Sequence, residues 1–254
     1  MDTTTAVVTE AQQQQYRDEG FFVLERVLSD QQLELLRTFA QEGMDEIDAR
    51  MDDAGVDIDV LGLNHRGRRY FANGMAKTAP ELRAFVFGDL MADICRATLG
   101  PNAFHFVEQY VIKCADRQSA FSWHQDSGYV HEEHEPYLTC WIALDDITEE
   151  NGCVYLLPYS RAGVRTYVKH FTDPATNDKV GYVGTDRGVP MVVPAGSIAC
   201  FSSVVFHRSG PNLTDRLRRA YIVQYSPEAI LTKDRSGPWE DFQPFLVDGT
   251  VVGH

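Results

Sequence analysis

The residues of this chain with the clearest chemical potential are two histidines and an aspartate. His124 and Asp126 form the one His-x-Asp triplet among eight histidines. In an extended segment, residues two apart point to the same side, so this imidazole and this carboxylate can face one point. His207, which directly follows the apolar run 204–206, is the candidate for a third ligand. Two histidines and one carboxylate that leave coordination positions open form the donor set of non-haem Fe(II) oxygenases.

A second pair with the same spacing offers an alternative. His131 and Glu133 lie in the run His-Glu-Glu-His-Glu-Pro, which contains no apolar residue apart from the proline. Such a run is typical of a solvated loop. A surface turn is also the simplest alternative for the His124 triplet when that triplet is taken alone.

The residues that follow His207 suit the binding of an acid. Ser209 shares a strand face with His207, and Arg218 opens a run in which alternation places it on the same face as Ile222. An arginine at the mouth of a strand beside a metal ligand can hold a dicarboxylate through a bidentate, charge-assisted fork. Arg219 falls on the opposite face, where a surface salt bridge is the better interpretation.

Helices are expected early in the chain and strands later. Capping patterns and apolar spacing predict helices over 9–19, 29–50 and 90–99, with a short strand at 21–24. Residues 51–79 are predicted to be irregular. Apolar runs between Gly, Pro and Asn then predict strands at 104–114, 137–144, 154–157, 191–193, 197–201 and 220–225. The pattern indicates a mainly β, α+β domain with a sandwich or barrel core.

The composition excludes several classes of partner. The 254 residues are 44% hydrophobic, and the formal net charge is −14. Such a charge repels nucleic acids and anionic membranes, so neither is expected, while a local basic pocket can still bind an acidic small molecule. Five widely spaced cysteines without a CxxC pattern predict reduced thiols. With no leader-like or membrane-spanning run, the protein is predicted to be cytoplasmic.

Together, these features resemble the phytanoyl-CoA dioxygenase (PhyH) family of Fe(II)/2-oxoglutarate oxygenases. Four motifs carry the resemblance, in matching order and spacing, over about residues 10–226. They are Trp123-His124-Gln125-Asp126; Trp141-Ile142-Ala143-Leu144-Asp145-Asp146; Asn151-Gly152-Cys153 with Leu157-Pro158; and His207-x-Ser209-x-x-Asn212 leading to Arg218-Arg219-Ala220. The resemblance implies a double-stranded β-helix, the jelly roll of cupins, flanked by N-terminal helices.

The metal ligands and catalytic residues that the resemblance implies are His124, Asp126 and His207. Related halogenases replace the carboxylate by a small residue, so the presence of Asp126 favours hydroxylation over halogenation. The implied enzyme is a non-haem Fe(II)/2-oxoglutarate-dependent dioxygenase that consumes O2 and releases succinate and CO2. Its substrate is expected to be a small organic molecule of secondary metabolism. The alternatives are an acyl-CoA 2-hydroxylase of the same family, a cupin-like metal protein without 2-oxoglutarate chemistry, and a non-catalytic barrel.

The resemblance also implies residues that bind 2-oxoglutarate. Arg218 and Ser209 would hold its distal carboxylate, and Trp141 would line its pocket. Gln109, on the strand 104–114, is carried over on weaker grounds, because a polar residue on a strand face explains it equally well.

The chain is interpreted as one oxygenase domain over 1–254. It would comprise a mostly helical buttress at 1–100, a jelly-roll core at 101–226 and a pocket-capping segment at 227–254. The sequence suits a monomer and a homodimer equally. It also leaves hydroxylation, desaturation, cyclisation and epimerisation open.

Three stretches are expected to wall the substrate pocket: 51–79, 160–190 and 227–254. In the first, the arginines at 66, 68 and 69 suit an acidic ligand, but a solvated turn that balances nearby aspartates is favoured. The second has the length of a lid. The third carries Trp239, Phe242 and Phe245, which suit either a cap on the pocket or packing on the core. Aromatic residues and few basic clusters favour a small organic substrate over a CoA thioester.

Overall fold

The computed structural model describes residues 6–60, 62–117, 119–174 and 178–252. The two ends of the predicted domain, 1–5 and 253–254, lie outside these ranges. The first hundred residues are mostly helical and form α1 (Glu10–Glu19), β1 (Phe21–Leu24), α2 (Asp30–Ala54), β2 (Arg69–Asn73), the 3-10 helix η1 (Met75–Lys77), α3 (Pro80–Val86) and α4 (Asp89–Thr98).

In the remainder of the chain, most of the regular elements are strands. Its elements are β3 (Ala103–Lys113), β4 (Phe121–His124), the 3-10 helix η2 (Asp126–Tyr129), β5 (Leu138–Ala143), β6 (Val154–Leu157), α5 (Tyr159–Ala162), β7 (Phe171–Thr172), β8 (Lys179–Val180), β9 (Val189–Pro190), β10 (Ile198–Ser202), β11 (Phe206–Ser209), β12 (Arg218–Ser226), β13 (Gln243–Val247) and β14 (Thr250–Val251).

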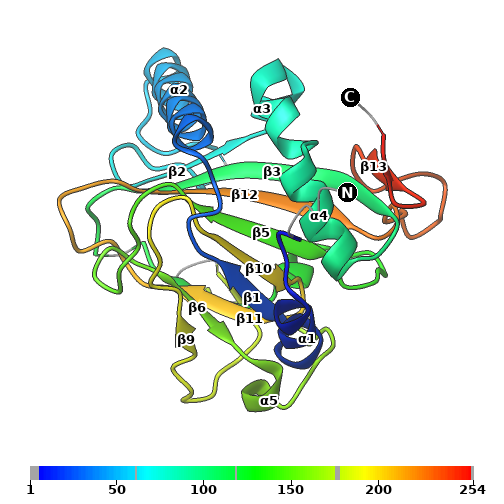
Figure 1. Ribbon diagram of the computed structural model, residues 1–254. Helices are drawn as coiled ribbons and strands as arrows, with labels where there is room; N and C mark the ends of the chain where they lie inside the picture. The colour runs from blue at the N-terminus through cyan, green and yellow to red at the C-terminus, as the bar shows by residue number, and fades with distance from the viewer. Residues whose placement is uncertain (1–5, 61, 118, 175–177, 253–254) are drawn as a thin grey trace.

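Two antiparallel sheets form the framework of the molecule. The large sheet has the order β1-β10-β5-β12-β3-β13-β14, with β2 also paired to β3, and the small sheet has the order β4-β11-β6-β9. Strands that are distant in sequence therefore pair within each sheet, and the small sheet lies below the large one in Figure 1. This is the double-sheet arrangement of a jelly roll, so the predicted fold class is confirmed.

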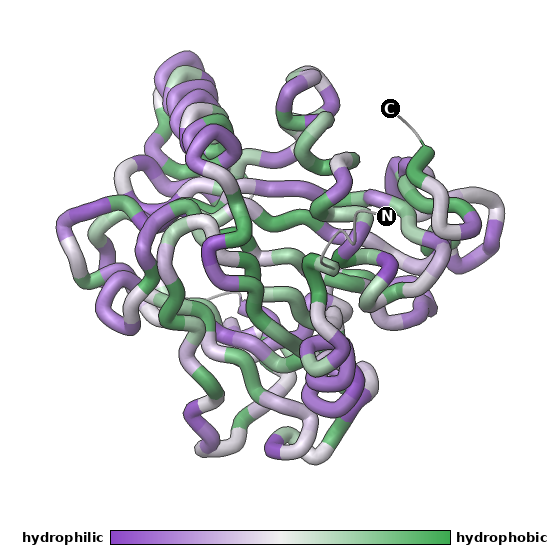
Figure 2. The backbone as a smooth tube through the Cα atoms, in the orientation of Figure 1, coloured by the Kyte–Doolittle hydropathy of each residue, from purple (hydrophilic) through white to green (hydrophobic). Residues whose placement is uncertain are grey.

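Two apolar cores lie on opposite faces of the large sheet. On its outer face, α2, α3 and α4 contribute the buried side chains Leu36, Leu82 and Ile94. Between the sheets, Phe201 of β10 packs in one cluster with Leu156 of β6. Figure 1 shows α2 and α3 above the large sheet, and Figure 2 shows hydrophobic residues along the central strands. The helices therefore close one face of the sheet and leave the other for the site.

The ends of the first helices are set by the caps that the sequence predicted. The side chains of Thr9 and Ser29 each accept a hydrogen bond from the backbone N–H of the glutamine three residues later. The side chain of that glutamine in turn accepts a hydrogen bond from the backbone N–H of the capping residue. Gly20 ends α1 in the left-handed conformation that glycine adopts without strain. The second helix runs to Ala54, beyond the predicted end near residue 50, because Gly55 supplies the left-handed cap.

The prediction that 51–79 is wholly irregular was wrong. Residues 69–73 form β2, which pairs with β3 in the register Tyr70 to Ile112 and Ala72 to Tyr110. Tyr70 and Ala72 are buried, while Arg69 and Phe71 are half-buried, so the strand alternates between its two faces. The arginines that precede and begin this strand obscured the pattern.

Two other local predictions failed. The predicted strand 191–193 is irregular, and β9 lies two residues earlier at Val189–Pro190 on the edge of the small sheet. Pro190 and Pro194 lack the N–H groups that would extend pairing in this region. Helix α3 was not predicted, although Pro80 at its first position is a recognised start signal.

None of the described helices could span a bilayer. The longest of them, α2, has 25 residues but is hydrophilic along much of its length, as Figure 2 shows.

Candidate active site

The structure brings His124, Asp126 and His207 to one point. One ligand atom from each residue lies within 4.8 Å of the others. His124 ends β4, and the register of β11 places His207 directly opposite it. Asp126 opens η2, so a tight turn, rather than the strand alternation assumed from the sequence, directs its carboxylate to the histidines. The three residues form a site that could hold a metal ion.

Backbone carbonyls orient both imidazoles. Nδ1 of His124 lies 2.7 Å from the carbonyl oxygen of Ser122, and Nδ1 of His207 lies 3.2 Å from that of Val205. A neutral ring that donates its Nδ1–H to a carbonyl keeps Nε2 as a free lone pair. Both histidines therefore present Nε2 as the atom able to bind a metal.

Two further side chains fix the carboxylate of Asp126. The hydroxyl of Thr139 donates to Oδ2 at 2.5 Å, and the amide of Gln224 donates to the same oxygen at 3.1 Å. The other oxygen, Oδ1, lies 3.3 Å from Nε2 of His207. One oxygen is therefore held by the protein and the other faces the histidines. The sequence prediction missed Thr139 and Gln224, which come from the neighbouring strands β5 and β12.

Burial and mutual charge set the protonation of the three residues. Burial, and then the nearby His207, lower the pKa of His124 to about 3, which keeps this ring neutral. Burial alone would raise the pKa of Asp126, but the attraction and hydrogen bond of His207 lower it to about 2. Burial would lower the pKa of His207, and the charge of Asp126 raises it instead. The site therefore holds a buried anion that attracts positive charge.

A cavity of about 390 Å³ opens beside the triad. Its wall includes the triad itself and the four other residues that the sequence singled out, namely Arg218, Ser209, Trp141 and Gln109. Trp141 lies on β5 and Gln109 on β3, and both face Ile222 of the strand between them. The fold thus gathers every predicted site residue on one cavity.

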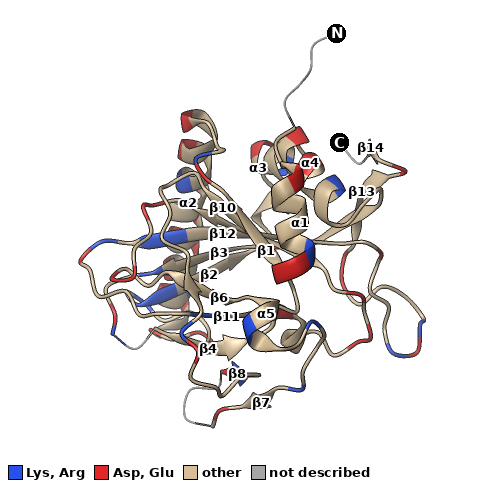
Figure 3. Ribbon diagram, turned by 60° about the horizontal axis from the view of Figure 1, so that its bottom comes forward, with Lys and Arg blue, Asp and Glu red and all other residues tan. Residues whose placement is uncertain are grey.

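One end of this cavity is cationic. Arg218 is 1% exposed, and its buried Nε and Nη1 atoms have no hydrogen-bond partner among the described residues. Burial lowers the pKa of Arg218 to about 10, which leaves it charged at neutral pH. Lys113 is its partner in the register of β3 and β12, and its side chain is fully buried. Figure 3 shows basic segments gathered at the same end of neighbouring strands, among them β2 and β12.

Lys113 controls the hydroxyl of Ser209. Its Nζ donates to Oγ of Ser209 at 2.8 Å and to the carbonyl oxygen of Gly210 at 2.7 Å. Because the lysine occupies an acceptor position of the hydroxyl, the hydroxyl hydrogen is free to donate elsewhere, and Ser209 lines the cavity. Burial, and then the nearby Arg218, lower the pKa of Lys113. Sequence reasoning missed Lys113, although this residue continues the alternation from Gln109 through Val111 and could have been found that way.

Comparison with known proteins identifies the family of the chain. A model of the phytanoyl-CoA dioxygenase (PhyH) family matches residues 16–220. This chain belongs to the PhyH family. Among its relatives, phytanoyl-CoA dioxygenase domain-containing protein 1 of Danio rerio is 22% identical over 258 residues, which cover 85% of this chain and 89% of the relative. The resemblance inferred from the motifs is therefore confirmed.

Solved structures share the fold of this PhyH-family chain. The non-heme alpha-ketoglutarate-dependent carbocyclase SnoK from nogalamycin biosynthesis superposes with a TM-score of 0.70 at 22% identity, covering 93% of this chain and 96% of SnoK. The epimerase SnoN, in complex with Fe3+, alpha-ketoglutarate and nogalamycin RO, gives a TM-score of 0.67 at 17% identity, covering 94% and 96%. At these identities the likeness establishes the jelly-roll fold.

Two residues of the PhyH motifs shape the turn between His207 and Arg218. The side-chain amide of Asn212 donates to the carbonyl oxygens of Lys113 at 3.0 Å and Arg216 at 2.6 Å. Gly152 has a φ of 86°, and a Cβ there would lie 2.6 Å from the carbonyl oxygen of Gly210. Asn212 therefore ties the turn to β3, while Gly152 leaves room for it.

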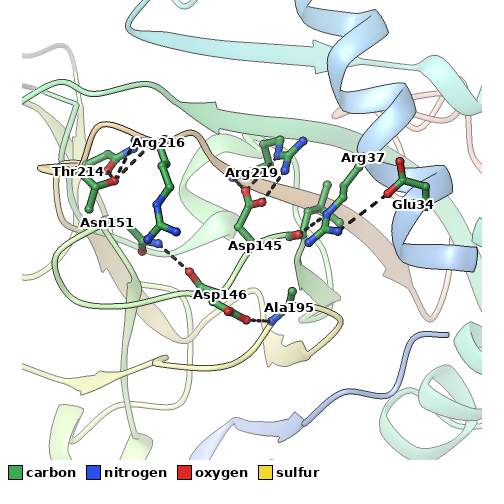
Figure 4. A network of polar contacts seen from close by, with 11 residues as sticks. Glu34, Arg37, Asp145, Asp146, Asn151, Ala195, Thr214, Arg216 and Arg219 are labelled. Atoms are coloured by element: carbon green, nitrogen blue, oxygen red, sulfur yellow. Dashed lines mark hydrogen bonds and ion pairs between the residues drawn. The ribbon is translucent and has the colours of Figure 1, made fainter. Parts of the chain in front are cut away.

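The second arginine of the PhyH motif has the structural role that the sequence favoured. Arg219 donates through Nη2 to Asp145 at 2.6 Å and through Nε to the same carboxylate at 3.1 Å. Figure 4 shows this pair beside Arg37, whose Nε donates to the carbonyl oxygen of Leu144. In the same view, Asp146 accepts from the backbone N–H of Ala195. These acidic residues fasten loops outside the cavity.

The basic cluster near residue 66 is a salt-bridged turn, as the sequence favoured. Arg66 forms ion pairs with Asp48, Asp52 and Asp57 at 3.5, 2.7 and 2.9 Å. Arg68 pairs with an aspartate at 3.0 Å, and Arg69 donates to backbone carbonyls of the preceding loop. The competing pair at 131 and 133 is exposed, in the solvated loop expected from its polarity.

The segment 160–190, predicted to be a lid, is hydrogen-bonded to the turn that carries His124 and Asp126. Gln125 lies between two triad residues and is fully buried. Its side chain accepts from the backbone N–H of Val168 at 2.8 Å and donates to the carbonyl oxygens of Thr166 at 3.0 Å and Val204 at 2.7 Å. The sequence prediction did not single out this role of Gln125.

Proposed function

We propose that this PhyH-family chain is an Fe(II)- and 2-oxoglutarate-dependent oxygenase that oxidises, and by default hydroxylates, a small organic molecule in natural product biosynthesis. One observation carries the proposal. One cavity holds a triad suited to a metal and a buried arginine, two of whose nitrogens have no hydrogen-bond partner among the described residues. SnoK and SnoN, which share the fold, are alpha-ketoglutarate-dependent enzymes.

The donor set of the triad fits iron. Two imidazole Nε2 atoms and one carboxylate oxygen lie within 4.8 Å of one another, and a six-coordinate metal would keep three positions open. The hydrogen bonds of Thr139 and Gln224 hold the carboxylate in place, as outer partners of metal ligands commonly do.

The cationic end fits the distal carboxylate of 2-oxoglutarate. The Nε and Nη1 donors of Arg218 suit a bidentate carboxylate, and the hydroxyl of Ser209 can add a third donor. An unpaired buried cation is costly, so an anionic ligand would relieve Arg218 and Lys113 together. Trp141 walls the cosubstrate off from water, with its ring centre 5.8 Å from the guanidinium carbon of Arg218.

The contribution of the protein is positioning. With iron bound, the metal would activate O2 to oxidise a C–H bond, while 2-oxoglutarate is converted to succinate and CO2. Arg218 and Ser209 would fix one end of the cosubstrate, so that its other end reaches the triad. The apolar cavity wall would exclude water. No described residue needs to act as a general base in this scheme.

The test is an anaerobic titration of the purified protein with Fe(II) and then with 2-oxoglutarate. The chelate is expected to give a weak visible charge-transfer band. Asp126→Ala should abolish the band, and Arg218→Ala should raise the 2-oxoglutarate concentration it requires by about 10- to 100-fold, because a hydrogen-bonded charge pair is lost. Arg219→Ala is the matched control, since that neighbouring arginine pairs with Asp145 outside the cavity.

The outcomes separate the proposal from its alternatives. A band in the wild type that depends on Asp126 and Arg218 supports the oxygenase. Iron binding without a band would overturn it in favour of a cupin-like metal protein. The absence of iron binding would remove the metal assignment as well.

A further inference from the structure

The chemical groups along the cavity follow a fixed order. On β12, Arg218 pairs with Lys113, while Gln224, six residues further on, pairs with Val107. At the strand rise per residue, these positions are roughly 20 Å apart. Gln224 bonds to Asp126, so the carboxylate of the triad lies further along β12 than the cations do. Tyr137 precedes β5 beyond Thr139, on the far side of the triad from Arg218.

This far half of the cavity is aromatic and uncharged. None of the described residues that line it carries a charge; they are Phe106, Val107, Tyr129, Val130, Tyr137 and Trp239. Arg208 also lies on the cavity wall, but its guanidinium stacks over Tyr155 at 3.8 Å and points away from this half. Once an acid occupies the cationic end, the rest of the cavity offers a ligand apolar surface and two phenol hydroxyls.

Packing holds this aromatic wall in place. Phe106 of β3 stacks on Phe242 at 4.9 Å and meets Tyr137 edge-on at 5.0 Å. The backbone N–H of Trp239 donates to the carbonyl oxygen of Ile230 at 2.8 Å, and Ile230 is buried in the same cluster. The C-terminal segment therefore holds Trp239 in a fixed position on the cavity wall.

The entrance on this side is also apolar. Tyr129 is 47% exposed, and its ring meets that of His124 edge-on at 5.5 Å. Trp239, which also lines the cavity, is half-buried. Large apolar side chains gathered at a cavity mouth are typical of a binding site for an apolar ligand.

We propose that the substrate is an uncharged organic molecule with an apolar, ring-containing body, which binds against Trp239 and Tyr129. The inference rests on the proposed function and names the substrate class of that site. A ring against Tyr129 lies beside the metal centre, because Tyr129 contacts His124. Phosphate or CoA groups would find no cationic side chain among the described residues of this half, so such substrates are rejected.

Paired probes test this inference in the anaerobic protein loaded with Fe(II) and 2-oxoglutarate. Binding is measured by calorimetry for 2-naphthol, which is neutral at pH 7, for the anion 2-naphthoate, and for hexadecanoyl-CoA. Occupying the cationic end with 2-oxoglutarate prevents the anions from binding to Arg218. We expect 2-naphthol to bind about ten-fold or more tightly than either anion.

Variants then locate the binding site. Trp239→Ala should weaken 2-naphthol binding about ten-fold and Trp239→Phe much less, since a ring still stacks there. Phe171→Ala, an exposed aromatic outside the cavity, should change nothing. All variants should keep the wild-type charge-transfer band.

Equal binding of the anions, no binding of 2-naphthol, or indifference to Trp239→Ala would each overturn the substrate class while the band still supports the oxygenase. Loss of the band in the wild type would instead refute the proposed function.

Discussion

The Nε2 atom of His170 accepts a hydrogen bond of 2.9 Å from the backbone N–H of Gln125, the residue between His124 and Asp126. The imidazole is packed closely against the same turn, because a Cβ at Gly128 or Gly181 would lie within 2.9 Å of it. The segment 160–190 thus contacts the turn of His124 and Asp126 through the ring of His170 as well as through the Gln125 side chain. It therefore has the role of a clamp on this turn.

Replacing His170 should loosen the metal ligands. His170→Ala leaves the Gln125 N–H without its partner and opens a void beside two ligands, so stability should fall by about 1–3 kcal/mol. Fe(II) affinity should fall about ten-fold, as for other outer partners of metal ligands. Denaturant unfolding and a metal titration measure the two effects. His131→Ala, in the exposed loop, is the control, and an unchanged metal affinity in H170A would refute the clamp.

Lys113 should strengthen the binding of 2-oxoglutarate while lowering the free energy of unfolding. Lys113→Met removes a buried cation beside Arg218, so the unfolding free energy without ligands should stay equal or rise by about 1–3 kcal/mol. The affinity for 2-oxoglutarate should fall about 10- to 100-fold, because Ser209 and Arg218 lose a charged neighbour. Calorimetry of 2-oxoglutarate binding and chemical unfolding test both parts. A variant that is both less stable and unimpaired in binding would contradict this role.

Lys113→Met should also change how the stability of the protein depends on pH. Burial, and then Arg218, lower the pKa of Lys113 below its ordinary value of 10.5, so the unfolded chain binds more protons at this side chain than the folded chain. Stability conferred by this residue must therefore rise as the pH increases towards 10.5. The stability advantage of K113M over the wild type should shrink over the same range. An advantage that grows with pH would show that Lys113 is not destabilised by burial.

Thr139 should act on the metal through Asp126. Thr139→Val keeps the shape of the side chain but removes the 2.5 Å hydrogen bond to Oδ2. Asp126 then loses one of two restraints, and Fe(II) affinity should fall about ten-fold with a shifted charge-transfer band. Thr38→Val, which removes an exposed hydroxyl on α2, is the control. A band at its original position in T139V would mean that Gln224 alone orients the carboxylate.

The residues proposed to bind the metal and 2-oxoglutarate were easier to predict from the sequence than the residues that support them. His124, Asp126 and His207 could be recognised because their types and spacing are rare in combination, and Arg218 and Ser209 because strand alternation fixes their face. Thr139, Lys113 and His170 act through contacts between strands or loops that are distant in sequence. Their partners depend on the pairing of β5 with β12, on the approach of β3 to β11 and on the path of the 160–190 loop.

The elements of the fold show the same division. Helices α1 and α2 follow from local signals, because Thr9 and Ser29 cap their starts and glycines end them. The positions of β2 and β9 depend instead on which neighbouring strand has an edge available for pairing. β2 forms at 69–73 because β3 is there to pair with it, whereas the apolar run 191–193 lies between two prolines.

Gly152 should be required for the turn beside Ser209, a residue proposed to bind 2-oxoglutarate. Gly152→Ala forces a side chain into a φ of 86° and places its Cβ 2.6 Å from the carbonyl oxygen of Gly210, which Lys113 also binds. Strain and overlap together should cost about 3 kcal/mol, and 2-oxoglutarate affinity should fall because the overlap displaces the turn beside Ser209. Gly163→Ala is the matched control: its φ is 70°, but no atom lies within 4 Å of the added Cβ, so only about 1 kcal/mol should be lost. Unfolding and 2-oxoglutarate titrations of both variants measure these effects. Equal losses in the two variants would show that backbone strain, and not contact with Gly210, makes Gly152 necessary.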